Sequence, residues 1–293
     1  VSVKVISDST SYLQKAVRDE FDIGIAPVRV LLDGVEYADD AEDCEPFFRA
    51  LEASSAMPTT SQPTVGELAA LMEQHVAAGH DVAGVFISDK LSGTFGAARL
   101  AREMVLEKYP KAGIELVDSE SNSTELGLAV LAAARAAAEG VDLAAAVAAA
   151  RAMVERSRLL FVPSTLEYLR RGGRIGGAMA LVGSILRIRP ILTAADGVTS
   201  VFARVRTMER AIATMLATLS ADLSAKGGLT YVSALHIHAP ASAHALAERV
   251  ARITGAPVPV VPVGPAIGAH VGPGAIGITY ATVEPMRKSR GRV

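Results

Sequence analysis

The sequence contains little cysteine, no tryptophan and few aromatic residues of any kind. Its single cysteine, Cys44, excludes an intramolecular disulfide and any metal site built from several cysteines. The aromatic content of 4% leaves few flat side chains on which nucleic-acid bases or sugar rings stack. An aliphatic ligand therefore suits this chain better than an aromatic one, and Cys44 is interpreted as an inert thiol.

The sequence also lacks a charge excess and long apolar runs. Its 29 basic and 31 acidic residues give a formal net charge of -2, which provides no global basic field for nucleic acid. Apolar runs are interrupted well before the roughly 20 residues that a membrane-spanning helix needs. No secretory leader is recognisable. We therefore expect a soluble, cytoplasmic protein that does not bind nucleic acid.

A strand, a polar loop and a helix follow one another four times in the first half of the chain. The clearest case is the apolar run 85–87, which gives way to a helical pattern at Ser92-Gly93-Thr94. Gly140-Val141-Asp142 is predicted to divide a later Ala-rich segment into two helices. Such alternation predicts a parallel sheet with helices on both faces. We therefore expect a three-layer α/β domain over residues 1–157.

The second half of the chain has a different pattern. Asp196-Gly197 lies between the predicted strands 185–193 and 198–206, which is a strong signal for an antiparallel hairpin. Further helices and strands alternate up to a last predicted strand, 275–282. We therefore expect an α+β domain over residues 158–287, followed by a basic tail over 288–293.

Hydroxyl-bearing loops follow several predicted strands. Ligands of parallel sheets lie at the carboxyl ends of the strands, where the loops at Asp8-Ser9, Ser92-Gly93-Thr94 and Asp118-Ser119 emerge. Ser92 and Thr94 either cap the following helix or help to hold an anion. The Pro-bracketed segment 57–64 is predicted to be a fixed loop that presents Thr60 and Ser61. Thr64 within it is also an ordinary capping-box residue for Glu67.

Two further motifs, a histidine pair and a glycine-rich segment, do not predict a metal site or a dinucleotide site. His236 and His238 share a face of a predicted strand, but no third metal ligand is nearby, so core or surface histidines are favoured. Gly272-Pro-Gly274-Ala-Ile-Gly277 precedes a strand and not a helix, which excludes a dinucleotide site. These glycines instead permit a tight turn beside His270, whose imidazole can donate to an oxyanion. No metal and no cofactor are expected.

An arginine-rich segment runs from position 170 to position 206. It contains seven arginines against one acid, Asp196. A solvated basic face is the ordinary interpretation, and the alternative is a patch for phosphate, an acidic partner or anionic lipid. The residues that we single out for docking are Arg170, Arg171, Arg174, Arg204 and Arg206.

Several short motifs together resemble the DegV proteins, which are the fatty-acid-binding subunits of bacterial fatty acid kinase. The resemblance covers nearly the whole chain and rests on Ser7-Asp8-Ser9-Thr10, Thr60-Ser61-Gln62-Pro63, Leu91-Ser92-Gly93-Thr94, Asp118-Ser119, Gly172-Gly173-Arg174-Ile175, Arg189-Pro190-Ile191-Leu192 and Gly268-Ala269-His270 with Gly272-Pro273-Gly274. Val271 and Arg189 stand where many members have Thr and Lys.

This resemblance implies a long-chain fatty acid held between the two domains, with the C-terminal domain closing the acyl tunnel. It implies that Thr60, Ser61, Ser92 and His270 bind the carboxylate, and we include Gly93 and Thr94 with them. It also implies that this chain is not itself an enzyme, because a separate ATP-dependent kinase subunit phosphorylates the acid. The partners expected are therefore the fatty acid, the kinase subunit and, transiently, an anionic membrane. The alternative is an enzyme acting on a small anion with Ser92 as nucleophile.

Overall fold

The protein is described by a computed structural model that covers residues 2–40, 42–181 and 188–286. It forms two compact units. Within the described residues, unit 1 comprises 2–29 and 60–154, and unit 2 comprises 30–40, 42–59, 155–181 and 188–286. The predicted basic tail and Arg187, at the start of the predicted hairpin, lie outside the described residues.

Unit 1 is built around a four-stranded parallel sheet, as the repeated strand-loop-helix pattern predicts. The strand order is β2-β1-β6-β7. The strands are β1 (Val3–Asp8), β2 (Gly24–Ala26), β6 (Asp81–Phe86) and β7 (Ile114–Asp118). The helices are η1 (Ser9–Ser11, a 3-10 turn), α1 (Lys15–Glu20), α3 (Val65–Ala77), α4 (Thr94–Lys108), α5 (Ser123–Ala138) and α6 (Leu143–Arg156).

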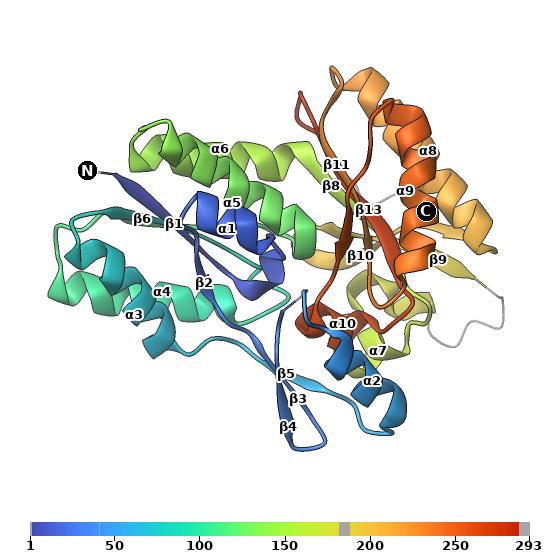
Figure 1. The fold of residues 1–293 in the computed structure, drawn as a ribbon, viewed down its shortest axis with the longest axis horizontal. Coiled ribbons are helices and arrows are strands. Elements are labelled where there is room, and N and C mark those ends of the chain that lie inside the picture. Colours follow the sequence, from blue (N-terminus) through green and yellow to red (C-terminus); the bar gives the residue numbers. More distant parts are fainter. Residues whose placement is uncertain (1, 41, 182–187, 287–293) are drawn as a thin grey trace. The chain divides into compact units, whose positions relative to one another are not determined.

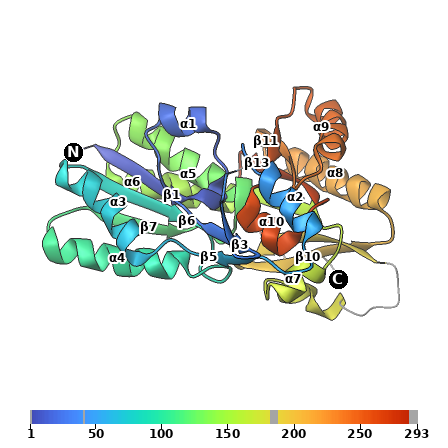
Figure 2. The same cartoon turned by 60° about the horizontal axis from the view of Figure 1, so that its bottom comes forward.

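Helices cover both faces of this sheet (Figure 1). On one face, α3 and α4 pack on the strands through a cluster that includes Leu68, Met72, Ala98 and Phe86. On the other face, α5 lies against β1 and β6, with α6 beside it (Figures 1 and 2). Full burial of each large apolar side chain stabilises the unit by about 1.5–3 kcal/mol. The predicted break between α5 and α6 is confirmed.

Unit 2 contains a six-stranded, mainly antiparallel sheet, which confirms the expected α+β character. The strand order is β10-β9-β8-β13-β11-β12. The strands are β8 (Ser157–Val162), β9 (Arg189–Ala195), β10 (Val198–Val205), β11 (Leu229–His236), β12 (Val260–Pro262) and β13 (Ile276–Thr282). The helices are α2 (Glu45–Ala53), α7 (Glu167–Arg171), η2 (Gly176–Leu181, a 3-10 helix), α8 (Met208–Ala225), α9 (Pro240–Thr254) and α10 (Pro265–Val271).

Residues 30–59 belong to unit 2, although the sequence division at 157/158 treats 1–157 as one continuous domain. Contacts within unit 2 explain this grouping. The Asp39 carboxylate accepts a hydrogen bond from the Ala266 amide at 2.8 Å, and the Phe48 ring stacks on His238 with centroids 5.1 Å apart. A Cβ on Gly268 would lie 2.7 Å from the Phe48 ring. A residue without a side chain therefore lets α10 approach this aromatic ring.

A second small sheet corrects the prediction for the segment 57–64. The strands β3 (Arg29–Leu32), β4 (Val35–Ala38) and β5 (Thr59–Ser61) form it in the order β4-β3-β5. The segment 23–32 forms two strands, β2 and β3, because Pro27 between them lacks the amide hydrogen that a continuous ladder needs. The predicted loop 57–64 contains β5, so Thr60 and Ser61 lie on a short strand.

Candidate functional site

The carboxyl ends of β1 and β6 mark the candidate site in unit 1. From β1 the chain continues to β2 on one side, whereas β6 pairs with β1 on the other side. This reversal is the topological switch point at which open parallel sheets bind ligands. The hydroxyl-bearing residues Ser9, Thr10 and Ser92 follow these two strand ends. The predicted convergence of loops after parallel strands is therefore present in unit 1.

Asp8 joins the two strand ends. It is fully buried, and its carboxylate accepts hydrogen bonds from the amides of Thr10 at 3.0 Å and of Ile87 at 2.9 Å. The Thr10 hydroxyl donates to the same carboxylate. Burial raises the pKa of Asp8 above its usual value, while these donors oppose the rise. Asp8 thus fixes the backbone from which the site loops emerge, a role that the sequence analysis did not assign to it.

Serines after β7 stabilise the same region. The Ser121 carbonyl accepts the Ser88 amide at 2.9 Å, and the Ser119 amide donates to the Phe86 carbonyl at 3.1 Å. The Ser119 hydroxyl donates to the Ser121 carbonyl at 3.1 Å. The backbone of this loop therefore holds that of the β6 loop, and the buried Ser119 hydroxyl stabilises the loop from within.

Ser92, Gly93 and Thr94 lie where α4 begins, as the change of pattern predicts. The hydroxyl oxygens of Ser92 and Thr94 are 2.9 Å apart, and the Thr94 amide donates to the Ser92 hydroxyl at 3.3 Å. Gly93, and not Ser92, is the N-cap residue. Ser92 is half-buried, Gly93 is exposed and Thr94 is fully buried. A Cβ on Gly93 would fall on the Gln62 side-chain amide, so this glycine keeps the junction close to the segment that follows β5.

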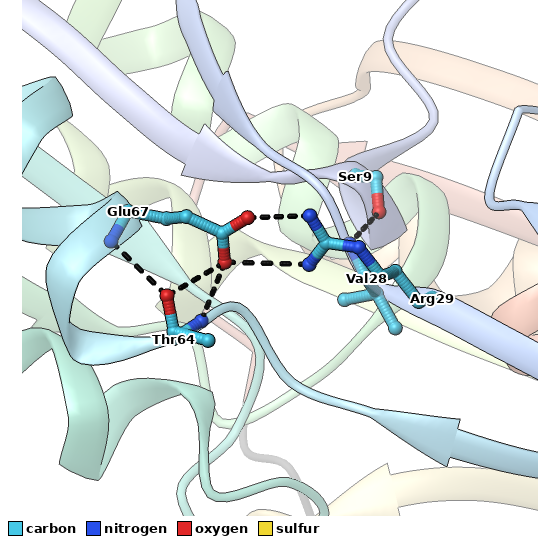
Figure 3. A network of polar contacts seen from close by, with 5 residues as sticks. All are labelled: Ser9, Val28, Arg29, Thr64 and Glu67. Atoms are coloured by element: carbon cyan, nitrogen blue, oxygen red, sulfur yellow. Dashed lines mark hydrogen bonds and ion pairs between the residues drawn. The ribbon is translucent and has the colours of Figure 1, made fainter.

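A polar network anchors the segment that carries Thr60 and Ser61 (Figure 3). The predicted capping box is confirmed: the Glu67 amide donates to the Thr64 hydroxyl at 3.2 Å, and the Thr64 amide donates to the Glu67 carboxylate at 2.8 Å. The Arg29 guanidinium pairs with both carboxylate oxygens of Glu67. This ion pair, together with the Thr64 donors, lowers the pKa of Glu67 to about 2. The network fixes the start of α3 directly after Pro63.

His270 belongs to unit 2, where it lies near the end of α10. The predicted tight turn follows it, since Gly272 and Gly274 have φ angles of 86° and 85°. A Cβ on Gly172 would lie 2.5 Å from the His270 Nδ1 atom, so the imidazole packs against a residue without a side chain. Burial and the Arg174 charge lower the pKa of His270 to about 4. His270 is therefore neutral at pH 7 and acts there as a hydrogen-bond donor or acceptor, not as a cation.

The docking arginines differ in their local contacts. Arg170 forms an ion pair with Glu167 at 2.6 Å, and Arg171 lies 4.0 Å from the same carboxylate. The Arg174 guanidinium donates to the Gly172 carbonyl at 2.7 Å. Arg204 and Arg206 are exposed at the end of the β9–β10 hairpin. The basic charge of Arg170 and Arg171 is thus partly compensated by an acid that precedes the arginine-rich segment.

The alternative functions gain no geometric support. Hydrogen bonds to the Ser92 side chain come only from Thr94 among the described residues, and neither group of Thr94 is a general base.

The His236 imidazole accepts the Ala239 amide at 3.2 Å, and burial lowers its pKa to about 4. In the described part of the chain, no group of three His, Cys, Asp or Glu side chains is arranged to hold a metal. No described helix is both long enough and apolar enough to cross a bilayer.

Comparison with known proteins identifies the family. A family profile described as "Uncharacterised protein, DegV family" matches residues 2–283. The chain belongs to the DegV family. A DegV domain-containing protein of Clostridium acetobutylicum is 41% identical over 287 residues, which span 98% of this chain and 100% of that protein.

Solved structures, two of which are described as DegV proteins, share the fold over nearly the whole chain. A Thermus thermophilus member, whose structure is described as showing fatty acid binding, has a TM-score of 0.85 and 30% identity and covers 96% of this chain and 100% of its own. DegV of Bacillus subtilis, described as a fatty acid binding protein, has a TM-score of 0.84 and 30% identity. The match covers 96% of this chain and 99% of that protein. A stearic acid-binding protein of Eubacterium ventriosum has a TM-score of 0.86 and 25% identity. The match covers 96% of this chain and 98% of that protein. The expected DegV-like, two-domain α/β fold is confirmed.

Proposed function

We propose that this chain binds one long-chain fatty acid and presents its carboxylate to a separate kinase subunit, without catalysing the phosphorylation itself. The observation that carries the proposal is the similarity over 96% of the chain to DegV structures described as fatty acid binding. The carboxylate ligands in this proposal are Thr60, Ser61, Ser92, Gly93, Thr94 and His270.

The chemistry of these residues suits a carboxylate. A negative oxygen prefers hydroxyl and amide donors at a helix N-terminus, and Ser92 and Gly93 lie at the start of the 15-residue helix α4. Thr94 is fully buried and its hydroxyl contacts that of Ser92, so in this proposal it also positions Ser92. A neutral His270 donates one hydrogen bond without adding charge, which leaves the carboxylate less tightly held than an arginine would hold it.

The acyl chain supplies most of the affinity in this account. Burial of each methylene contributes about 0.8 kcal/mol, so a chain of about fifteen methylenes gains roughly 12 kcal/mol before ordering costs. A ligand held so strongly leaves slowly by simple dissociation and stays bound through purification. Transfer to a partner therefore has to occur on a docked complex.

We propose that this docking uses the exposed arginines Arg170, Arg171, Arg174, Arg204 and Arg206, with the kinase subunit or an anionic membrane as partner. Diffuse attraction to a membrane weakens with salt, whereas docking to a protein depends on individual arginines. Liposome binding and kinase-dependent phosphorylation of Arg174→Gln and Arg204→Gln variants across ionic strength test this part. If neither readout changes in either variant, these arginines form only a solvated face.

The carboxylate site is tested by Ser92→Ala and His270→Ala. Loss of a hydrogen bond to a charged carboxylate costs about 1.5–3 kcal/mol, so each variant should bind oleate about ten- to a hundredfold more weakly. Ser224→Ala and His244→Ala are matched controls, since both residues are exposed on helices of unit 2. A double-mutant cycle between Ser92 and His270 tests whether they share one carboxylate. Unchanged affinity in both single variants removes these residues from the site.

A further inference from the structure

Unit 2 contains a pocket of about 540 Å³ that shares only Arg206, one of the docking arginines, with the fatty acid proposal. It lies where the residues after β8 meet the beginning of β9 and the connection from β10 to α8. None of its lining residues belongs to the carboxylate ligands proposed above. Its volume falls within the range of about 300–1,000 Å³ typical of small-molecule sites.

Two arginines give this pocket its charge. Arg189 and Arg206 both line it, and no acidic residue does. The antiparallel pairing of β9 and β10 places Arg189 opposite Val205, so Arg189 and Arg206 lie at the same end of the hairpin. Within the described part of the chain, no hydrogen bond or ion pair joins either guanidinium to another residue.

Nearby acids are already paired. Glu209, in the first turn of α8, forms an ion pair with Arg249 at 2.9 Å. Glu167 pairs with Arg170 at 2.6 Å. These two carboxylates therefore do not neutralise the pocket arginines, whose positive charge is available to a ligand.

The beginning of α8 adds to this positive charge. Thr207 and Met208 line the pocket, and Thr207 caps the 18-residue helix by accepting the Arg210 amide at 3.2 Å. The positive end of the helix macrodipole favours an anion there by a modest amount. The arginines and the helix terminus thus act on the same volume.

Apart from the hydroxyl-bearing Ser164 and Thr165, the rest of the lining is aliphatic. Leu166, Ile188 and Met208 contribute apolar side chains, as do Pro163 and Pro190, and no aromatic ring is present among the lining residues. A bare phosphate ion fills only a small part of a pocket of this volume and leaves the apolar wall wet. A ligand that matches both the arginines and this apolar part of the lining therefore has a doubly charged anionic head and a small aliphatic body.

We propose that this pocket binds a phosphate monoester with a small aliphatic body. The Arg189 and Arg206 guanidinium groups hold the phosphate, because their forked N–H donors match its oxygens in bidentate geometry. A phosphate dianion matches two guanidinium charges better than a carboxylate does. Leu166, Ile188 and Met208 hold the body. This second site shares no residue with the proposed carboxylate ligands.

The test is calorimetric titration of the full chain, with oleate added first so that any fatty acid site is already filled. The probes are n-butyl phosphate, inorganic phosphate and butanoate. We expect one n-butyl phosphate per chain, bound more tightly than either of the other two probes. Binding of inorganic phosphate as tight as that of the ester overturns the assignment of an ester, and absence of ester binding overturns the site.

Charge-removing variants locate the ligand. Arg189→Gln and Arg206→Gln should each weaken n-butyl phosphate binding about ten- to a hundredfold. Arg252→Gln is the matched control, because Arg252 is exposed on α9 and does not line the pocket. Arg189→Lys keeps the positive charge but loses the forked N–H donors, so its affinity for n-butyl phosphate should lie between those of the wild type and Arg189→Gln. If both glutamine variants bind the ester as the control does, the pocket is not a phosphate site.

Oleate content measured on the same samples separates the two proposals. It should be equal in Arg189→Gln and the wild type, because Arg189 belongs neither to the carboxylate ligands nor to the docking arginines. Loss of ester binding with full oleate content supports the second site. A protein that binds no oleate but does bind the ester overturns only the fatty acid proposal.

Discussion

Replacement of Asp8 is predicted to weaken both the fold of unit 1 and the candidate site. One oxygen of the buried Asp8 carboxylate accepts the Thr10 amide, and the other accepts the Ile87 amide. In Asp8→Asn the side-chain oxygen can serve one of these amides, and the new NH₂ group then faces the N–H of the other. One buried donor is left without an acceptor.

The magnitude follows from the number of donors left unpaired. A buried, unsatisfied N–H costs about 1–3 kcal/mol, so Asp8→Asn should lower the free energy of unfolding by roughly that amount. Asp8→Ala leaves both amides unpaired and should cost roughly 2–6 kcal/mol. Because whole domains are stable by only about 5–15 kcal/mol, the alanine variant should lie close to unfolding.

Asp118 provides the matched control at the end of β7, in the same sheet. Its two carboxylate oxygens also accept one backbone amide each, from Asp89 at 3.3 Å and from Glu120 at 2.8 Å. Asp118 is only half-buried, so water can replace a lost acceptor, and Asp118→Asn should cost less than about 1 kcal/mol. Urea unfolding followed by circular dichroism suits a chain without tryptophan. If Asp8→Asn is no more destabilised than Asp118→Asn, the buried carboxylate does not hold the strand ends together.

Three further predictions concern the anchoring network and His270. Thr64→Ala removes the side-chain cap of α3 and should lower the free energy of unfolding by about 1 kcal/mol in urea titrations. An unchanged free energy of unfolding would contradict a stabilising role of this cap. The paired Glu67, with its lowered pKa, stabilises the fold above pH 4.5, and this contribution is lost as pH falls toward 2. The stability difference between wild type and Arg29→Gln should therefore shrink from pH 5 to pH 3, whereas a constant difference rejects the linkage. The His270 imidazole should titrate near pH 4 in an NMR pH series, and its contribution to stability should decline as pH falls from 6.5 toward 4; a midpoint near 6.5 contradicts its burial.

Periodicity and turn chemistry predicted much of the fold. Asp196 and Gly197 have left-handed φ angles of 53° and 77°, as the two-residue hairpin turn requires. At the predicted break between the two Ala-rich helices, the Ala145 amide donates to the Asp142 side chain at 2.8 Å. These features depend on residues close together in the sequence, so the sequence alone contains the information for them.

Structural features that have no signal in the local sequence were not predicted. β5 consists of Thr59, Thr60 and Ser61, which show no apolar alternation, so only pairing within a sheet makes this segment a strand. α10 has seven residues and contains a glycine, and packing within unit 2 stabilises a helix that propensity does not predict. Residues 30–59 join unit 2 through contacts such as that of Asp39 with Ala266, 227 positions away.

The same distinction applies to the candidate site. The Ser92-Gly93-Thr94 junction was predicted from its change of period, and the hydroxyls do lie at the start of α4. Only part of the structural role of Asp8 could be predicted from the sequence. An Asp two residues before Thr10 signals a local turn, whereas its bond to Ile87 spans 79 residues and depends on the pairing of β1 with β6.

The most direct test of the fatty acid proposal is the identity of the ligand that the protein retains. The chain is expressed in bacteria, purified without added lipid, denatured in organic solvent and extracted, and the extract is quantified by mass spectrometry. The account predicts close to one long-chain fatty acid per chain, with a reduced content in Ser92→Ala and an unchanged content in Ser224→Ala. Repeated preparations that yield no fatty acid, from protein that also fails to bind added oleate, contradict it.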